Sequence, residues 1–148
     1  MTGTDSTPSN IYPCIFYDDA LAAIEWLCRA FGFEKRLVVP GPNGTIGHSE
    51  LSLGPGVIMV GSVSAEQGCI SARRLPGVHQ AICVHIDDPD SHFARAKAAG
   101  AVVVREIRDE GYGSRGYMVK DPAGSQRYFG TYLPGAHWRE HVEALAVA

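Results

Sequence analysis

The chain has 148 residues, of which 45% are hydrophobic and 20% charged, and its formal net charge is −3. These values suit one compact domain, or two small modules that share a core. They supply no cationic surface for nucleic acid or an anionic membrane, and no apolar run approaches the roughly 18 residues of a membrane span.

The first ten residues, MTGTDSTPSN, are polar and lack the basic start and apolar stretch of a signal peptide. We therefore expect residues 1–10 to form a flexible tail. Four cysteines form no C-x-x-C pair, which favours reduced thiols in a cytoplasmic protein over a disulfide scaffold.

A first module with the order β-α-β-β-β is predicted over residues 11–62. The segment 11–17 is rich in β-branched and aromatic residues, as strands are. Asp18 and Asp19 then precede apolar residues at 3.6-residue spacing, which predicts a capped helix that ends at Gly32. Residues 33–40 are predicted to form the next strand.

A hairpin closes this module over residues 44–61, GTIGHSELSLGPGVIMVG. Polar and apolar residues alternate before the turn Gly-Pro-Gly, and period two predicts a strand with one buried face. His48, Glu50 and Met59 are expected on the opposite face. An imidazole and a carboxylate two residues apart are unusual on a face that is only solvated, so this face is where we look for function.

The same order of elements returns after a linker over 63–78. The second module is predicted over 79–132 and is followed by a C-terminal helix over 133–148. Asp18 and Asp87, Cys14 and Cys83, and Gly61 and Gly130 are each 69 residues apart, which indicates a tandem duplication. The predicted fold class is α+β, one folded domain in which two βαβββ modules form a curved sheet that lines a cleft, with the helices outside.

These paired modules, the stretch DDALAAIEWLCRAFGF and the turn Asp121-Pro122-Ala123-Gly124 resemble the vicinal oxygen chelate superfamily. This superfamily includes glyoxalase I, bleomycin-resistance proteins and extradiol dioxygenases. The resemblance covers residues 11–132 and implies a glyoxalase/bleomycin-resistance fold and a homodimer. HSEL with G-x-G-V-I-M-V-G, followed by YGSRGYMVKDP, is similar to glyoxalase-like members of unassigned function.

The resemblance also implies metal ligands in the first and last strands of each module. The family pattern D-P-x-G-x-x-x-E places a carboxylate where this chain has Tyr128, and the duplicate position is Met59. The first-strand positions are His79, and Asn10 or Ile11. A thioether and a neutral phenol are poor ligands for a hard divalent cation, so we expect no cofactor. One divalent metal ion in a displaced site is the alternative.

Other candidate site residues come from the predicted concave face. His48 and Glu50 are the candidate catalytic residues; they could also contact a ligand, bind a metal ion with His79, or form only a hydrogen-bonded polar pair. Arg115 follows a glycine-rich run and could bind a carboxylate or phosphate, or be an ordinary surface residue. The 69-residue register places Tyr117, matching His48, and Tyr128 on the concave face, where they would contact a planar ligand or fill the cavity.

The first hypothesis is a metal-independent, glyoxalase/bleomycin-resistance-like protein that binds a small, aromatic organic molecule. The second is an enzyme, a metal-dependent lyase, isomerase or dioxygenase that uses His48, Glu50 and His79. The third is an antibiotic-sequestering resistance protein that works by stoichiometric binding alone. The expected partners are a small-molecule ligand and a second copy of the chain, with neither nucleic acid nor membrane.

Overall fold

The computed structural model describes residues 9–136, 138 and 139. Most of the tail expected over 1–10 and of the helix expected over 133–148 lies outside these residues. Module 1 comprises β1 (Cys14–Tyr17), α1 (Ala20–Phe31), β2 (Glu34–Pro40), β3 (Ile46–Leu53) and β4 (Gly56–Ser62). Module 2 comprises β5 (Ala81–His85), α2 (Pro89–Ala98), β6 (Val102–Asp109), β7 (Arg115–Lys120) and β8 (Gln126–Gly130). The predicted α+β fold with two tandem βαβββ modules is confirmed.

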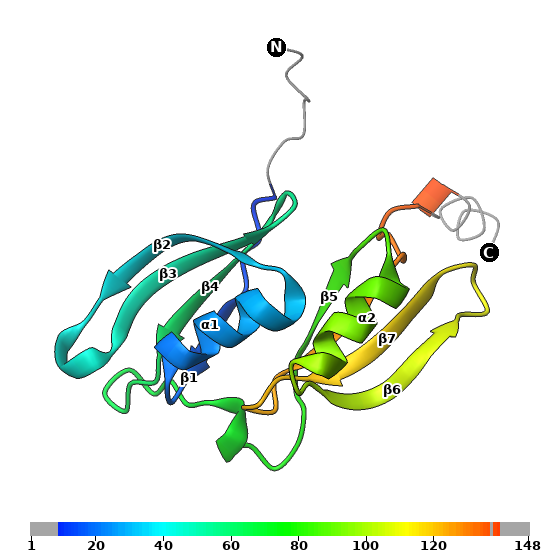
Figure 1. Ribbon diagram of the computed structural model, residues 1–148. Coiled ribbons are helices and arrows are strands. Elements are labelled where there is room, and N and C mark those ends of the chain that lie inside the picture. Colours follow the sequence, from blue (N-terminus) through cyan, green and yellow to red (C-terminus); the bar gives the residue numbers. More distant parts are fainter. Residues whose placement is uncertain (1–8, 137, 140–148) are drawn as a thin grey trace, which may run out of the picture.

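Each module folds its strands into its own four-stranded mixed sheet (Figure 1). The strand orders are β1-β4-β3-β2 and β5-β8-β7-β6, and only the pairs β1–β4 and β5–β8 are parallel. Strands β1 and β5 are therefore edge strands, and among the described residues they do not pair with each other. The hydrogen-bonded sheet does not continue from one module to the next.

Both helices begin at the aspartates that the duplication predicts. The Asp19 carboxylate accepts a hydrogen bond from the Ala22 N–H at 3.1 Å, and the Asp88 carboxylate accepts one from the Ser91 N–H at 3.2 Å. These bonds satisfy helix N–H groups that have no partner within the helix. Helix α1 ends at Gly32, whose φ of 83° is a left-handed conformation that glycine adopts without strain.

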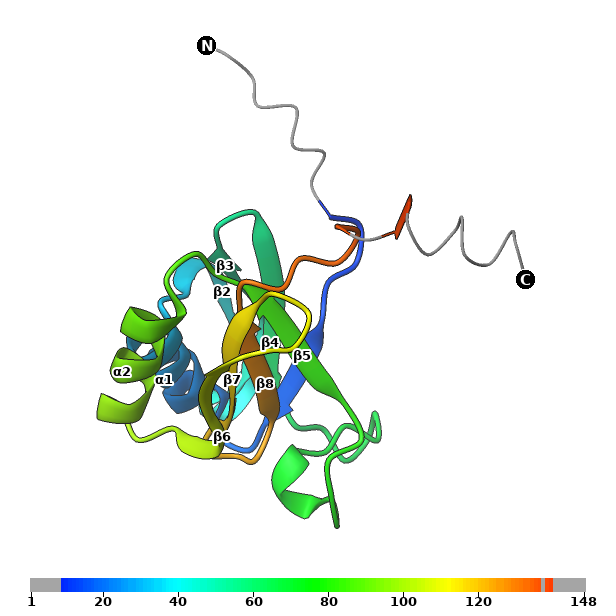
Figure 2. The same ribbon diagram turned by 90° about the vertical axis from the view of Figure 1, so that its right-hand side faces the viewer.

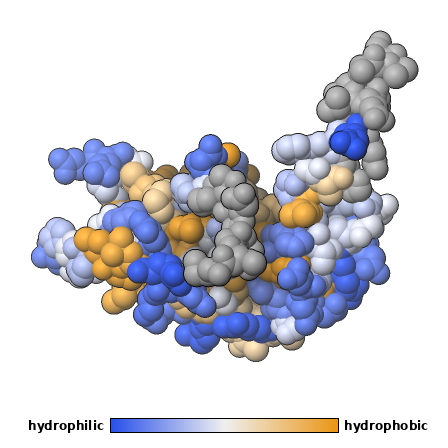
Figure 3. Space-filling model, turned by 90° about the horizontal axis from the view of Figure 1, so that it is seen from above, coloured by the Kyte–Doolittle hydropathy of each residue, from blue (hydrophilic) through white to orange (hydrophobic). Residues whose placement is uncertain are grey.

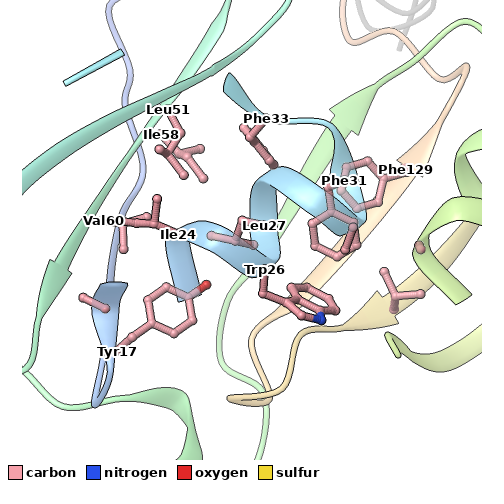
Figure 4. Packing of buried hydrophobic residues seen from close by; sticks show 14 of the residues in the cluster. Tyr17, Ile24, Trp26, Leu27, Phe31, Phe33, Leu51, Ile58, Val60 and Phe129 are labelled. Carbon is pink, nitrogen blue, oxygen red and sulfur yellow. The ribbon is translucent and has the colours of Figure 1, made fainter. Parts of the chain in front are cut away.

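Helices α1 and α2 lie on the same side of the strands (Figure 2). The apolar stripe of α1 (Ile24, Leu27 and Phe31) is buried against both modules, and the Phe31 ring lies 4.6 Å from the Phe129 ring of β8 (Figure 4). The two modules therefore share one core. The side of each sheet that faces away from the helices is called the open face below. Within the described residues, no helix is long and apolar enough to cross a membrane.

A buried polar triad also joins the modules. The Tyr17 hydroxyl of β1 donates to Asp121 Oδ2 at 2.5 Å, Arg127 Nη1 of β8 donates to the same oxygen at 2.9 Å, and Arg127 Nη2 donates to the Tyr17 oxygen at 3.0 Å. All three side chains are almost fully buried. A buried charge pair must be hydrogen-bonded to offset its loss of hydration, and this triad meets that requirement across the module boundary.

The 69-residue register holds in part of the repeat and fails in another. The first and last strands keep the expected separation, because Cys14 pairs with Met59 and Cys83 pairs with Tyr128. On the next strand, however, Met59 pairs with Glu50 and Tyr128 pairs with Met118. Glu50 and Met118 therefore correspond at a separation of 68. The turn before β8 has one residue more than the turn before β4, because residues 121–125 stand in the place of 53–56. A one-residue slip exchanges the two faces of a strand, so the predicted register is wrong for β3 against β7.

Candidate functional site

The open face of module 1 carries the expected pair of polar side chains. His48 and Glu50 leave the same face of β3, and their Nε2 and Oε2 atoms are 2.8 Å apart. Each side chain is 42% exposed. The contact orients the imidazole and leaves Nδ1 and the second carboxylate oxygen available, so the pair has the geometry of a proton acceptor and donor at one place.

Met59 lies opposite Glu50 on the neighbouring strand β4. It lines a cavity of about 390 Å³ together with His48, Phe16 and Cys14, and the segments 42–47 and 60–67 complete the wall. This volume lies within the usual range of small-molecule sites. The predicted residues His48, Glu50 and Met59 are therefore brought together.

A second cavity of about 360 Å³ lies between the edge strands β1 and β5, next to the connection 68–80. Cys14 and Phe16 line both cavities, so the two adjoin. His79 lines this second cavity and stands just before β5, which begins at Ala81. It lies in the connection between the modules.

Arg115 is on the helix side of its sheet, and its expected place over the open face is wrong. The guanidinium binds Asp90 of α2 through two hydrogen bonds of 2.9 and 2.8 Å, and Asp109 accepts a third at 3.2 Å. Hydrogen bonding to Arg115 lowers the pKa of the Asp90 carboxyl below its usual value. The side chain therefore fastens helix α2 to strand β7.

Tyr117 is fully buried beneath α2, which corrects the prediction that it lines the concave face. Its hydroxyl lies 2.5 Å from Nδ1 of His92, and Nε2 of His92 lies 2.8 Å from the Phe31 carbonyl oxygen. Burial raises the pKa of Tyr117 and lowers the pKa of His92. With a neutral imidazole, Tyr117 donates to Nδ1 and the Nε2–H donates to Phe31.

Tyr128 does lie on the open face, in module 2. Gly116 occupies the position that corresponds to His48, and the Tyr128 hydroxyl packs against Gly116 and Gly130. The Arg105 guanidinium lies 5.8 Å from the centre of the Tyr128 ring. Arg105, which pairs with Met118 of β7, was not among the residues that the sequence predicted for the site.

The positions that would hold a metal ion have the wrong chemistry for a hard cation. At the meeting of the first and last strands, Cys14 stands beside Met59 and Cys83 beside Tyr128. Burial raises the pKa of both thiols and of the Tyr128 phenol, so these groups are neutral near pH 7. No three His, Cys, Asp or Glu side chains converge in the part of the chain that the structure describes. The residues present do not fit the metal that the vicinal oxygen chelate fold implies.

Comparison with protein families and solved structures gives one consistent result. Residues 11–126 match the family model of the Glyoxalase/Bleomycin resistance protein/Dioxygenase superfamily. An uncharacterized protein of Mycobacterium bovis is 33% identical over 116 residues, which are 76% of this chain and 76% of that protein. A similar protein of Mycobacterium tuberculosis has the same identity, over 76% of this chain and 68% of its own length.

Among solved structures, TioX from Micromonospora sp. ML1 is 35% identical, with a TM-score of 0.68 over 84% of this chain and 99% of that chain. A glyoxalase/bleomycin resistance protein/dioxygenase family enzyme from Burkholderia phytofirmans PsJN has a TM-score of 0.65 at 20% identity, over 80% of this chain and 94% of that chain. At 20% identity the second likeness concerns the fold alone.

Proposed function

Because the chain belongs to the Glyoxalase/Bleomycin resistance protein/Dioxygenase superfamily, we propose that it binds a small organic molecule on its open face without a metal ion. The observation that carries this proposal is the half-exposed His48–Glu50 pair beside a cavity of about 390 Å³. Convergent polar groups at the edge of a partly apolar cavity are typical of ligand sites.

The chemistry of the lining favours a flat, partly apolar molecule. Met59 and Phe16 supply apolar surface in the cavity of module 1, and burying such surface is worth about 25 cal/mol per Å². Glu50 and His48 would engage an amine or a hydroxyl group of the ligand. Tyr128 would supply an aromatic wall from module 2.

We propose further that two copies of the chain complete the site. Strands β1 and β5 have unpaired edges, and Cys14, Ala81 and Cys83 along them are exposed. Covering an unpaired edge is one way in which proteins prevent unwanted pairing. Size-exclusion chromatography with light scattering measures the mass directly, and a mass of one chain across micromolar concentrations would remove this part of the proposal.

The test of binding is a thermal-shift screen of aromatic antibiotics and metabolites. A ligand at a hundredfold excess over its dissociation constant adds about 2.7 kcal/mol of stability. We expect Glu50→Gln and Tyr128→Ala to weaken the response of the same ligands. Stabilising ligands that neither substitution weakens would place the site elsewhere.

Binding alone would suit a protein that sequesters an antibiotic, whereas the His48–Glu50 contact also favours acid–base catalysis by an enzyme. Two measurements separate these functions. Ligand recovered unchanged after incubation supports binding alone, and a changed product supports catalysis. Calorimetric titration with Zn²⁺, Ni²⁺, Mn²⁺ and Fe²⁺ should give no stoichiometric site, and one tight equivalent lost in Glu50→Gln would favour the metal-dependent lyase, isomerase or dioxygenase.

A further inference from the structure

The cavity of module 1 lies beside an irregularity in strand β3. The pairing of β3 with β4 ends at Glu50 and Met59. Beyond this pair, the Ile46 N–H donates a hydrogen bond of 2.8 Å to Ser62 Oγ. Between these two points β3 has three residues (47–49) and β4 only two, so β3 carries a β-bulge. The register of β3 with β2 shifts at the same place.

The buried side chain of Ser49 holds the bulge in place. Its hydroxyl group donates to the Val60 carbonyl oxygen at 2.6 Å and accepts a hydrogen bond from the Val60 N–H at 3.2 Å. In module 2, strands β7 and β8 pair without a shift, and Gly116 faces Gly130 directly. Bulges re-aim side chains and recur beside functional sites. Here the bulge includes His48, the polar residue that borders the cavity.

Gly61 is an uncovered part of the cavity floor. It pairs with Phe16 of β1, and a Cβ atom added to it would lie no closer than 3.8 Å to any atom beyond its chain neighbours. The equivalent Gly130 is covered, because a Cβ atom there would lie 2.7 Å from the Tyr128 hydroxyl. Gly61, Phe16 and His48 all line the cavity of about 390 Å³. A glycine inside a strand often marks a place where a ligand approaches the backbone closely.

His48 offers the cavity a hydrogen-bond acceptor. Its Nε2 lies 2.8 Å from Glu50 Oε2, and since a carboxylate accepts, Nε2 donates and Nδ1 of the neutral imidazole is the acceptor. A ligand group that meets Nδ1 must therefore be a donor. None of the described residues that line the cavity is Lys, Arg, Asp or Glu, so a charged ligand group would lose hydration there without a counter-charge.

Apolar surface alone does not single out this cavity, because apolar residues lie among hydrophilic ones on both halves of the molecule in Figure 3. The cavity is distinguished by bare backbone at Gly61, with an aromatic ring on one neighbouring strand and an imidazole on the other, since β4 lies between β1 and β3. Bare backbone gives a flat contact surface. A planar ring covers such a surface with more atoms in contact than a puckered ring does.

We propose that a planar, hydroxyl-bearing ring of the ligand lies against Gly61, with Phe16 on one side and His48 on the other. This inference rests on the proposed function and names the class of ligand, a neutral phenol. The phenol O–H donates to His48 Nδ1, and the ring contacts Phe16 and Met59. Gly61 thereby determines specificity, because a side chain at this position would occupy the space of the ring.

Three probes test the class of ligand. The compound 2-naphthol has a planar ring and a donor, 2-methoxynaphthalene lacks the donor, and decahydro-2-naphthol lacks the planar ring. By calorimetry on the full chain we expect 2-naphthol to bind about tenfold more tightly than either, the factor that corresponds to 1.4 kcal/mol. Its ring current should shift the NMR signals of the Gly61 Hα atoms more than those of Gly130. Equal affinities, no binding of 2-naphthol, or unshifted Gly61 signals would overturn the proposal.

Gly61→Ala separates binding from folding. The added methyl group makes only ordinary van der Waals contacts, the nearest side-chain atoms being those of the Phe16 ring at 3.9 Å, and alanine restricts the unfolded chain more than glycine does. We therefore expect an unchanged or higher melting temperature, together with an affinity for 2-naphthol that is about tenfold lower. Gly56→Ala, at the other end of β4 and outside the cavity, is the matched control and should keep the affinity.

The two proposals fail in different ways. The place of the ring is wrong if Gly61→Ala keeps the affinity for 2-naphthol or lowers the melting temperature. Binding that Glu50→Gln weakens and Gly61→Ala does not would keep the proposed function and remove the inference about Gly61. A tenfold loss in Gly61→Ala with unchanged affinity in Glu50→Gln would keep the place of the ring and remove the His48–Glu50 pair from the site.

Discussion

Module 1 and module 2 share one order of strands and helix, yet they fill their open faces differently. In module 1, His48 and Met59 border an open cavity. In module 2, glycine replaces the histidine and tyrosine replaces the methionine, so that Tyr128 lies down over Gly116 and Gly130. One scaffold therefore presents a cavity on one half and an aromatic wall on the other, and a ligand between them would meet two different surfaces.

The buried sides of the two sheets differ as well. Ile58 of β4 is an ordinary core residue, whereas the corresponding residue of β8 is Arg127, held by Asp121 and Tyr17. The polar triad crosses the module boundary, and an apolar pair could not fix the relative position of the modules by directed hydrogen bonds. The duplicated halves thus differ on their open faces and where the two modules meet.

The largest expected effect comes from breaking this triad. In the wild type, the Ala123 and Ser125 N–H groups donate to Asp121 Oδ1 at 3.0 Å each. In Asp121→Asn the side-chain amide oxygen can still accept these two hydrogen bonds, so the turn keeps them. The substitution also leaves the Arg127 charge buried without its carboxylate. We expect the free energy of unfolding to fall by about 3 kcal/mol, as measured by urea denaturation.

The matched control replaces Arg127 by isoleucine, the residue that module 1 has at the corresponding position. Adding Arg127→Ile to Asp121→Asn removes the uncompensated charge, so part of the lost stability should return. A loss below 1 kcal/mol in Asp121→Asn, or a double variant less stable than the single one, would show that the triad does not hold the modules together.

Grafting the open face of module 2 onto module 1 should give the next largest effect. His48→Gly with Met59→Tyr copies the residues at the corresponding positions and should let the new ring cover the cavity. We expect an aromatic ligand found by the thermal-shift screen to lose about a hundredfold in affinity, or 2.7 kcal/mol. Met59→Leu preserves apolar volume and should keep most of the affinity. A grafted protein that folds and binds normally would contradict the assignment of the cavity.

The sequence was sufficient for the fold because its signals are local. Asp19, Gly32 and Asp88 end or begin helices through contacts with their own neighbours in the chain, and alternation in β3 follows from strand geometry alone. The pairing of His48 with Glu50 was predictable for the same reason, since two residues of one strand are separated by a fixed distance.

The assignments that failed depend on register and on distant partners. Because the turn before β8 has one extra residue, the register of β7 differs by one and the Tyr117 side chain lies on the core face. Nothing in the local sequence pattern indicates this difference. Arg115 looked free in sequence, but Asp90, 25 residues away, binds it. Arg105 of β6, Glu110 of the following turn and Tyr128 of β8 lie together, and such a juxtaposition appears only when the sheet is assembled.

A smaller effect on the free energy of unfolding is expected from a change of pH. It involves His92 of α2, which contacts the last residue of α1, Phe31. Burial, and next the nearby Arg95, hold the pKa of His92 below its usual value. The folded state therefore favours the neutral imidazole. The contribution of this preference to the free energy of unfolding is complete above the unfolded pKa of about 6.5. As the pH falls below this value, stability should decrease, by at most about 1.4 kcal/mol per pH unit for one proton.

Urea denaturation of wild type and His92→Gln between pH 7.5 and pH 5 measures this dependence. The variant removes the titrating group, so its stability should change less steeply over the same range. Equal slopes for the two proteins would mean that His92 does not couple protonation to folding.

The smallest expected effect concerns a feature in which the two modules agree. Asp19→Ala and Asp88→Ala each remove the side chain that caps a helix, and a lost cap costs about 1 kcal/mol. Helix α1 has no acidic residue in its first turn, whereas α2 keeps Asp90 there. A negative charge near a helix N-terminus is worth about 0.3–1 kcal/mol, so Asp88→Ala should cost a few tenths of a kcal/mol less than Asp19→Ala. Asp87→Ala, one position before the cap of α2 and fully exposed, is the control and should stay within about 0.5 kcal/mol of wild type. Urea denaturation of the three variants checks the order, and caps that cost no more than this neighbour would refute the equivalence of the two helix starts.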